Sequence, residues 1–315
     1  MGEPLITIGI TCYREGEWLR ECWESVLDQT DDRWEAVLVM DGTDHGPTRE
    51  VFARLEHPRL RKVALPENVG PYPTRNKAFE LTRTPYHLYL DGDDQLAPGA
   101  VALLLDGFAR RPDAAVVYGD YAIFREGAEA PVHFWRYPRA LRDDLYADAQ
   151  PIPAGSAYRR SLWEALGGFA QELARGNGDY DFLIGAAEAG HVAVHCGAAH
   201  YRYRAARGER VSKSYDRRYH ETHEIMVARH PRFFANPRRR DRFLSLGERR
   251  AALACYAAGD DAGAAALARA AIGRGLRGDA RLWSVLAAAT LRPLPRRALT
   301  AATRALGGSS QGRDP

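Results

Sequence analysis

Short apolar segments of β type alternate with helical segments through the first hundred residues of this 315-residue chain. Strands that are buried on both faces of a parallel sheet are nearly continuous apolar runs, and helices usually connect them. The alternation therefore predicts an α/β domain with a Rossmann-like, mostly parallel sheet and helices on both faces. The expected strands cover residues 5–11, 34–40, 60–65 and 86–90, and the expected helices cover 18–27, 48–55 and 75–81.

The pattern continues less regularly after residue 98. Proline and glycine dominate residues 138–157 and predict a loop. The basic segment 205–214 has no clear period and is expected to be a mobile loop. The other expected elements are a helix after Pro98, a strand over 115–121, a short helix over 161–166, a helix from Asp179 and a strand over 192–195.

The segment Tyr86–Leu96 is an apolar, aromatic-rich run that stops at three acidic residues, Asp91, Asp93 and Asp94. The carboxyl ends of strands are where open α/β sheets bind ligands. Carboxylates at such a place suit Mg²⁺ or Mn²⁺, which prefer oxygen ligands and leave positions open for substrate phosphates. The alternative is that these residues form only a turn followed by the N-cap of the next helix.

The first two expected strands also end near acidic residues, Glu15 and Asp41. Parallel strands present their carboxyl ends at one edge of a sheet. We therefore expect Glu15, Asp41 and Asp91 to converge on one crevice.

Composition points to a globular protein in a reducing compartment. With 45% hydrophobic and 27% charged residues the chain can bury a core, which argues against disorder. Its four cysteines lie far apart, without the paired spacing of a zinc or redox motif, which favours the cytoplasm. No apolar run reaches 18 residues and the first residues lack a basic region, so we expect neither a spanning helix nor a signal peptide.

Positive charge is concentrated towards the C-terminus. Residues 229–315 contain 17 arginines and lysines against 6 acidic residues, whereas residues 1–228 contain 27 against 35. Residues 246–286 are alanine-rich and predict helices, and residues 281–306 mix leucine with arginine. Such a basic amphipathic stretch suits an anionic membrane surface. The alternative is a packing helix with a solvated basic face.

Several short motifs occur in an order and spacing that resemble the inverting family-2 glycosyltransferases of GT-A fold. The resemblance covers about residues 5–205. We therefore expect a GT-A catalytic domain over residues 1–235, a basic, alanine-rich helical extension over 236–306 and a flexible tail over 307–315. The motifs are residues 11–15 (Thr-Cys-Tyr-Arg-Glu), 25–30, 40–42, 68–70 with 75–76, 90–94, 167–169 and 179–181.

The resemblance implies a nucleoside-diphosphate-sugar donor, with a UDP- or dTDP-sugar favoured. Thr11, Tyr13 and Glu15 would hold the nucleoside, the tyrosine giving a flat apolar surface for the base. Asp41 would accept a hydrogen bond from a ring N–H of the base, unless it only caps a turn. Arg75 would reach the ribose or the diphosphate as a permanent cation, unless it is a solvated helix-start arginine.

The resemblance also assigns the acidic turn. Asp91 would bind the ribose and Asp93 the divalent metal, with Gly92 between them in the donor site and Asp91 as a second candidate ligand. A metal that bridges the diphosphate neutralises the charge that builds there as the sugar bond breaks. Asp94 would either support the metal site or, as we favour, cap the next helix.

Asp179 occupies the position of the catalytic base that takes the proton of the acceptor hydroxyl. Gly178 stands where the family has a glutamate, so the supporting acid is missing, and Asp181 is a second candidate for the base. The alternative is that Asp179 only caps the helix it begins. Weaker candidates are Asp120 beside the expected sugar-selecting loops, Arg210 and Lys213 in the expected mobile loop, and the histidines His195 and His200, which we favour as ordinary strand residues.

We therefore expect a cytoplasmic, metal-dependent, inverting glycosyltransferase of hexosyltransferase type. It would act on a hydroxyl of a glycan, a glycolipid or another acceptor in bacterial surface polysaccharide or glycoconjugate synthesis, with peripheral contact to the inner face of the membrane and no nucleic-acid partner. One rival is a sugar nucleotidyltransferase, which should show a glycine-rich loop with Arg and Lys in place of residues 11–15. The other is a non-catalytic nucleotide-sugar-binding protein, an alternative that the change at Gly178 leaves open.

Overall fold

The computed structural model describes residues 2–126, 130–174, 176–205 and 216–291. The chain divides into two compact units, Met1–Glu209 and Arg210–Pro315. This boundary lies before the expected limit at residue 235, because helix α9 (Tyr219–Arg229) packs on α10 (Pro237–Ala258) in the second unit. The expected mobile loop (apart from Ala205), residues 292–306 and the expected tail 307–315 lie outside the described residues.

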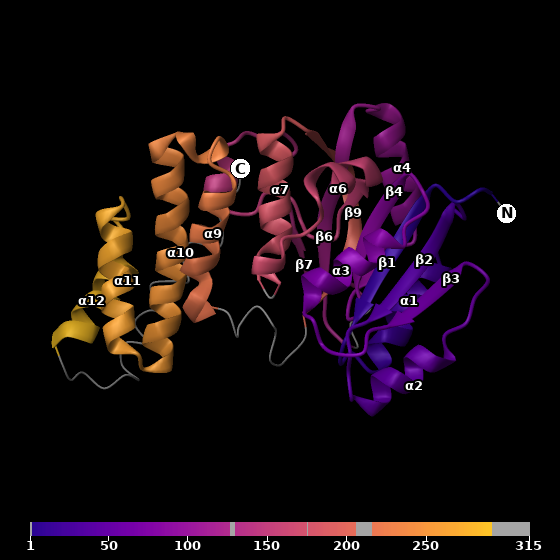
Figure 1. Ribbon diagram of the computed structural model, residues 1–315, viewed down its shortest axis with the longest axis horizontal. Coiled ribbons are helices and arrows are strands. Elements are labelled where there is room, and N and C mark those ends of the chain that lie inside the picture. Colours follow the sequence, from indigo (N-terminus) through magenta and orange to yellow (C-terminus); the bar gives the residue numbers. More distant parts are fainter. Residues whose placement is uncertain (1, 127–129, 175, 206–215, 292–315) are drawn as a thin grey trace. The chain divides into compact units, whose positions relative to one another are not determined.

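Four parallel strands form the first part of the sheet, in the order β3-β2-β1-β4, as the alternation predicts (Figure 1). Their register places Thr11 beside both Val39 and Asp91, so the carboxyl ends meet at one edge. The elements are β1 (Ile6–Cys12), α1 (Glu17–Leu27), β2 (Trp34–Met40), α2 (Gly46–Arg54), β3 (Leu60–Ala64), α3 (Pro71–Glu80) and β4 (Tyr86–Asp91).

Beyond β4 the sheet is mixed rather than parallel, and its order continues β4-β8-β6-β9-β5. Strand β8 runs antiparallel to both neighbours, while β6 and β9 are parallel to each other. Strand β9 continues to Arg204 instead of stopping at His195, because it also pairs with β5. The elements are β5 (Gln95–Leu96), α4 (Ala100–Arg110), β6 (Ala114–Phe124), β7 (His133–Trp135), α5 (Leu145–Asp148), β8 (Ala157–Arg159), α6 (Arg160–Leu166), the 3₁₀ turn η1 (Gln171–Leu173), α7 (Gly178–Glu188) and β9 (Val192–Arg204).

Helices cover both faces of this sheet. On one face, alternate residues of β1 and β2, such as Ile8 and Leu38, share a core with α1 and α4. On the other face, Val37 and Val39 pack against Ala78 of α3. The period-2 alternation of side chains along β2 thus sends neighbouring residues to opposite cores.

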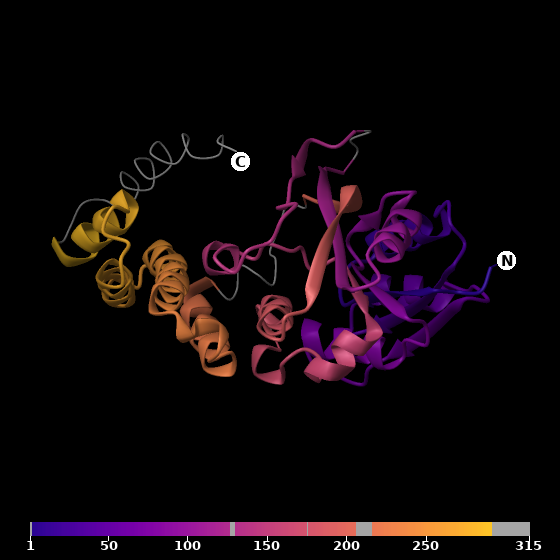
Figure 2. The ribbon, with the colours of Figure 1, turned by 90° about the horizontal axis from the view of Figure 1, so that it is seen from above.

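The second unit contains four helices within its described residues, α9, α10, α11 (Asp261–Gly273) and α12 (Ala280–Leu291), with the short turns η2 (Asp216–Arg218) and η3 (Phe233–Ala235). The last three helices lie side by side in both views (Figure 1; Figure 2). Their core consists largely of alanine, with Leu282 and Val285 of α12 buried in it. In the described part of the chain, no helix has the length and hydropathy that crossing a membrane requires.

Candidate active site

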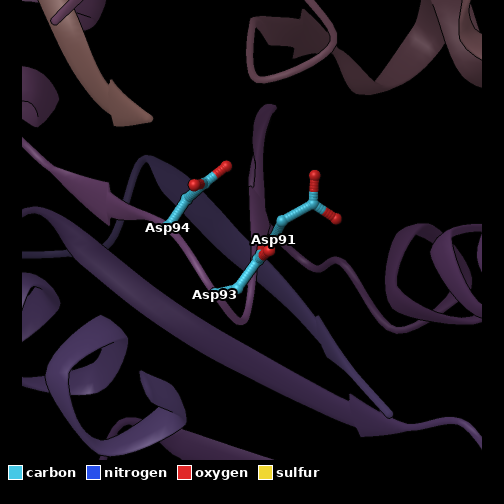
Figure 3. Close-up of side chains that lie close together, drawn as sticks. All are labelled: Asp91, Asp93 and Asp94. Carbon is cyan, nitrogen blue, oxygen red and sulfur yellow. The ribbon is translucent and has the colours of Figure 1, made fainter. Parts of the chain in front are cut away.

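The acidic turn lies directly after β4 (Figure 3). Asp91, Asp93 and Asp94 each offer a carboxylate oxygen, and these oxygens lie within 4.8 Å of one another. The turn is tight because Gly92 runs close to β1: a Cβ on Gly92 would lie 2.8 Å from the carbonyl oxygen of Thr11. A residue without a side chain is therefore required between the acids.

Asp94 is not the N-cap of the next helix, which was the favoured expectation. Helix α4 begins at Ala100 with Gly99 as its N-cap. Instead, the Asp94 carboxylate is buried and accepts hydrogen bonds from the Tyr201 hydroxyl at 2.9 Å and from the backbone N–H of Arg204 at 2.7 Å. Burial raises the pKa of Asp94 well above its usual value, with Asp93 and Asp91 adding to the rise. Asp94 thus ties the acidic turn to β9.

Residues of α3 and β4 contact the Asp91 carboxylate. The Arg75 Nη2 atom lies 3.4 Å from Asp91 Oδ1, and the Tyr89 hydroxyl donates a hydrogen bond to the same oxygen. Burial raises the pKa of Asp91 to about 6, although the positive charge of Arg75 opposes the rise. A nearby divalent cation would favour the ionised form of this carboxylate.

Arg75 is only 7% exposed and does not reach the pocket described below. Its guanidinium carbon lies 3.9 Å from the ring centroid of Tyr89 and 4.7 Å from that of Tyr72. Its Nε and Nη1 atoms have no hydrogen-bond partner within the described part of the chain. The structure rules out a solvated Arg75, whereas its expected contact with the donor stays a prediction.

An open pocket of about 200 Å³ joins the acidic turn to helix α7. Asp91, Asp94 and Asp179 are among its lining residues. Carboxylates from strand β4, from the turn and from α7 therefore share one cavity, whereas Glu15 and Asp41, which were expected to converge with Asp91, are not among its described lining residues. The remaining lining residues are Tyr121, Tyr137, Gln150, Pro153, Ala154, Tyr201 and Tyr203.

Asp179 does not cap α7. The N-cap is Asn177, whose φ of 62° is a left-handed conformation that asparagine tolerates. Asp179 lies in the first turn, where its Oδ1 accepts a hydrogen bond of 2.5 Å from the Tyr72 hydroxyl and its Oδ2 one of 2.8 Å from the Gln150 amide. Sequence reasoning missed Tyr72 and Gln150, because nothing local marks either residue as the partner of an acid that lies 107 and 29 positions away, respectively.

Asp41 lies at the end of β2 and is 5% exposed. Its carboxylate accepts hydrogen bonds from the backbone N–H groups of Val69 and Gly70 at 2.8 and 3.0 Å, and from the Asn68 amide at 3.0 Å. The next residues start α3, where Gly70 has a φ of 93° and Pro71 follows at the first helical position. Asp41 therefore fixes the loop that leads into α3, and its contact with a base stays a prediction.

Three other expected donor residues lie near the end of β1. Thr11 is buried in the strand, and Tyr13 and Glu15 follow it with partial exposure. The backbone N–H of Tyr13 donates a 2.5 Å hydrogen bond to Glu15 Oε2. Burial nevertheless raises the pKa of Glu15 to about 7, with Asp93 and Asp91 adding to the rise. Near neutral pH this carboxyl group exchanges its proton readily, so it can either donate or accept a hydrogen bond.

Asp181, Asp120, His195 and His200 are not among the described residues that line the pocket. Asp181 is buried within α7 and is not among the described residues that line the cavity. Asp120 on β6 accepts hydrogen bonds from the Tyr137 backbone N–H at 2.9 Å and from His195 at 3.0 Å; these lower its pKa although burial opposes them. His200 is buried and contacts the Gly155 carbonyl oxygen at 2.6 Å. Arg210 and Lys213 lie outside the described residues.

The acidic turn fits a hard divalent cation. Its three clustered donors are all carboxylate oxygens, and the raised pKa values of Asp91 and Asp94 show the cost of crowding and burying negative charge there. Asp91 and Asp93 are partly exposed whereas Asp94 is buried, so the first two are the more accessible to a cation.

Comparison with known proteins identifies the family. A model of the family described as glycosyl transferase family 2 matches residues 7–167, which is more than half of the chain. The chain therefore belongs to glycosyl transferase family 2. It is 31% identical over 191 residues to chondroitin synthase of Escherichia coli, covering 59% of this chain. The chain spans only 18% to 27% of the length of the first three curated relatives it matches.

Solved structures confirm the GT-A fold and the helices that follow it. TarS 1-349 of S. aureus, in complex with UDP-GlcNAc, has a TM-score of 0.63 at 15% identity, with 96% of this chain and 92% of that chain covered. The mannosyltransferase PcManGT of Pyrobaculum calidifontis, in complex with GDP-Man and Mn²⁺, has a TM-score of 0.58 at 20% identity, with 97% and 81% covered. At these identities the likeness concerns the fold alone.

Proposed function

We propose that the chain is a metal-dependent, inverting glycosyltransferase that moves a sugar from a nucleoside-diphosphate sugar to an acceptor hydroxyl group. The observation that carries the proposal is the shared pocket, which Asp91, Asp94 and Asp179 all line. Such a pocket would bring a diphosphate with its cation, near Asp91, close to a carboxylate for the acceptor. Membership of glycosyl transferase family 2 supports this type of reaction.

The donor side would be formed by the ends of β1, β2 and β4. Tyr13 offers a flat surface to a base, and the buried Asp41 carboxylate offers acceptor capacity. We favour a UDP- or dTDP-sugar, and the similar fold of TarS in complex with UDP-GlcNAc supports a uridine nucleotide. The mannosyltransferase of similar fold binds GDP-Man, so nucleotides of both kinds belong in the test.

Asp93 and Asp91 would hold Mn²⁺ or Mg²⁺, the metal named in the mannosyltransferase complex being Mn²⁺. When bound, the cation supplies positive charge against the diphosphate as it leaves. The residues of this chain orient the site: Asp94 fixes the turn against β9, and Arg75 and Tyr89 hold Asp91.

On the acceptor side, Asp179 would accept the proton of the acceptor hydroxyl while that oxygen attacks the anomeric carbon. The leaving diphosphate lies on the opposite face of the sugar, so the configuration inverts. A sugar hydroxyl is a far weaker acid than a carboxylic acid, so the proton moves only as the new bond forms. The position of Asp179 therefore matters most, and the hydrogen bonds from Tyr72 and Gln150 fix that position.

The acceptor would be a glycan, a glycolipid or another hydroxyl compound of bacterial surface polysaccharide or glycoconjugate synthesis. Relatives named for chondroitin synthesis and for teichuronic acid biosynthesis support this class. The excess of arginine in residues 229–315 supports contact with an anionic membrane surface, where a lipid-linked acceptor lies.

The test is release of nucleoside diphosphate from a panel of UDP-, dTDP- and GDP-sugars with Mn²⁺ or Mg²⁺. We expect wild type to release UDP or dTDP, and to lose that activity with a chelator. Asp179→Asn should bind the nucleotide with unchanged affinity and turn over at least a hundredfold more slowly. Normal turnover of Asp179→Asn would refute the assignment of the base, and nucleotide binding without any turnover by wild type would favour a non-catalytic binder.

A further inference from the structure

Two tyrosines enclose the buried Arg75 side chain, and each of them donates a hydrogen bond to a different carboxylate of the pocket. The guanidinium carbon lies 4.7 Å from the ring centroid of Tyr72 and 3.9 Å from that of Tyr89. The Tyr72 hydroxyl donates to Asp179. The Tyr89 hydroxyl donates to Asp91.

We propose that Tyr72, Arg75 and Tyr89 form one positioning unit that sets the spacing between Asp179 on the acceptor side and Asp91 on the donor side. The inference rests on the proposed function, because it assumes that these two acids act in the same reaction. None of the three residues lines the described pocket, so they act through the carboxylates.

The stacked arrangement is suited to this role. A cation against two aromatic faces is attracted by both rings, and burial strengthens the attraction. Arg75 is 7% exposed and Tyr72 is 7% exposed, and Tyr89 is 1% exposed, so each side chain has little freedom to change rotamer. The guanidinium also lies 3.4 Å from Asp91, which adds an ionic contact on the donor side. Tyr72 and Arg75 both belong to α3. A shift of this helix would therefore move the partner of Asp179 and a partner of Asp91 together.

Gly178 makes room for the Tyr72 ring. A Cβ on Gly178 would lie 2.7 to 2.9 Å from three carbon atoms of that ring, closer than non-bonded carbon atoms approach. Any side chain at 178 must therefore displace Tyr72. The Tyr72 ring occupies the space that the Cβ of a glutamate at position 178 would need. The Tyr72 hydroxyl donates a hydrogen bond to Asp179.

The unit is anchored through the loop before α3. The Asp41 carboxylate accepts hydrogen bonds from the backbone N–H groups of Val69 and Gly70, and Tyr72 follows two residues later. The end of β2 thus fixes the start of α3, and α3 fixes the Tyr72 hydroxyl against Asp179.

Tyr72→Phe and Tyr89→Phe form a matched pair for the test, because each removes one hydroxyl and keeps the ring beside Arg75. The assay is UDP release with Mn²⁺ from the UDP-sugar that wild type turns over fastest among UDP-glucose, UDP-galactose and UDP-GlcNAc. Tyr72→Phe should lower kcat by about tenfold or more and leave the donor KM within about twofold, since a hydrogen bond to a charged group is lost at the base. Tyr89→Phe should mainly raise the donor KM and weaken Mn²⁺ binding.

Tyr118→Phe is the control for loss of a buried hydroxyl, because Tyr118 donates to the Pro138 carbonyl oxygen instead of a carboxylate and neither residue lines the described pocket. It should leave both kinetic constants within about twofold of wild type. Gly178→Ala is the second probe: it displaces the ring without removing a hydroxyl and should lower kcat as Tyr72→Phe does. In the double variant the two effects should not add.

Equal loss of kcat in Tyr72→Phe, Tyr89→Phe and Tyr118→Phe would overturn the inference, since that result means general packing. Unchanged kcat in both Tyr72→Phe and Gly178→Ala would also overturn it. Failure of the proposed function looks different: wild type would release no UDP, or Asp179→Asn would turn over normally. Thermal melting of every variant separates loss of folding from loss of turnover.

Discussion

The backbone N–H of Arg204 donates a 2.7 Å hydrogen bond to Asp94 Oδ1, while the Tyr201 hydroxyl donates a 2.9 Å bond to Oδ2 of the same carboxylate. Both donors belong to β9, and Asp94 belongs to the turn after β4. The sequence suggests Asp94 as a helix cap or as a support of the metal site. In the structure Asp94 instead connects the turn after β4 to β9 at the pocket. Its neighbour Asp93 differs in exposure and has the candidate metal role.

Asp94→Asn should destabilise the catalytic unit. An amide has one acceptor oxygen, so one of the two buried donors would face an NH₂ group and lose its partner. We expect a loss of about 1 to 3 kcal/mol in the free energy of unfolding. Urea denaturation of the variant and wild type at one pH measures it. An unchanged midpoint would show that this bond to β9 is not needed for folding.

Asp93→Asn should weaken cation binding while leaving stability nearly unchanged. Asp93 is partly exposed, and its carboxylate lies with those of Asp91 and Asp94 in the cluster. Loss of one anionic ligand should reduce Mn²⁺ affinity by about tenfold or more. Calorimetric titration with Mn²⁺ and UDP measures the affinity, and thermal melting without metal is the control. Equal Mn²⁺ affinity in variant and wild type would contradict the metal role.

Glu15 should make the native state less stable as pH rises. Burial raises its pKa from 4.5 to about 7, so the folded chain binds more protons at this site than the unfolded chain between those values. The free energy of unfolding therefore falls as pH rises through that window. Glu15→Gln keeps an acceptor for the Tyr13 N–H and should be more stable than wild type by up to about 3 kcal/mol near pH 8, but not near pH 4. Urea midpoints that differ equally at both pH values would contradict this prediction.

Asp41→Asn should loosen the loop before α3. The amide cannot accept hydrogen bonds from Asn68, Val69 and Gly70 together, so the unfolding free energy should fall by about 1 to 3 kcal/mol. Because α3 carries Tyr72, the variant should also lose kcat. If Asp41 only contacted the base of the nucleotide, the variant would bind UDP more weakly, and the melting temperature of the free protein would be unchanged. Melting and UDP titration of the same sample separate the two outcomes.

The full chain should bind anionic vesicles in a salt-dependent manner. Residues 229–315 carry 17 arginines and lysines against 6 acids, and each basic residue near an anionic surface contributes about 1 kcal/mol. Co-sedimentation with vesicles containing phosphatidylglycerol should fall at high salt and be absent with phosphatidylcholine alone. Binding that is equal for both lipids would contradict an electrostatic contact.

The parallel strands and the acids at their ends could be predicted from the sequence, because local patterns encode both. A buried strand such as β2 is an apolar run interrupted only by Glu35, and Asp41 and Asp91 stand at the ends of such runs. In a parallel sheet the carboxyl ends of neighbouring strands then lie at the same edge, so no long-range contact has to be known to predict this. The parallel register of β1, β2 and β4 confirms the shared sheet edge, whereas of the three acids expected to converge there only Asp91 lines the described pocket.

The contacts that hold these acids could not be predicted, because they join residues far apart in the chain. Tyr72 stands in a Pro-Tyr-Pro turn that predicts a loop, whereas the structure starts α3 there. Tyr201 belongs to none of the short sequence motifs, although its hydroxyl donates a hydrogen bond to Asp94. The favoured cap role of Asp94 was wrong for the same reason: a local capping rule cannot account for a bond to β9.

The contact between Gly178 and the Tyr72 ring restricts how this protein can change over time. A mutation that adds any side chain at 178 collides with an aromatic ring, and a mutation that shrinks the ring leaves Asp179 without its phenol. Each single step passes through an impaired enzyme. A variant with an acidic pair at 178–179 therefore needs a smaller residue at position 72 as well.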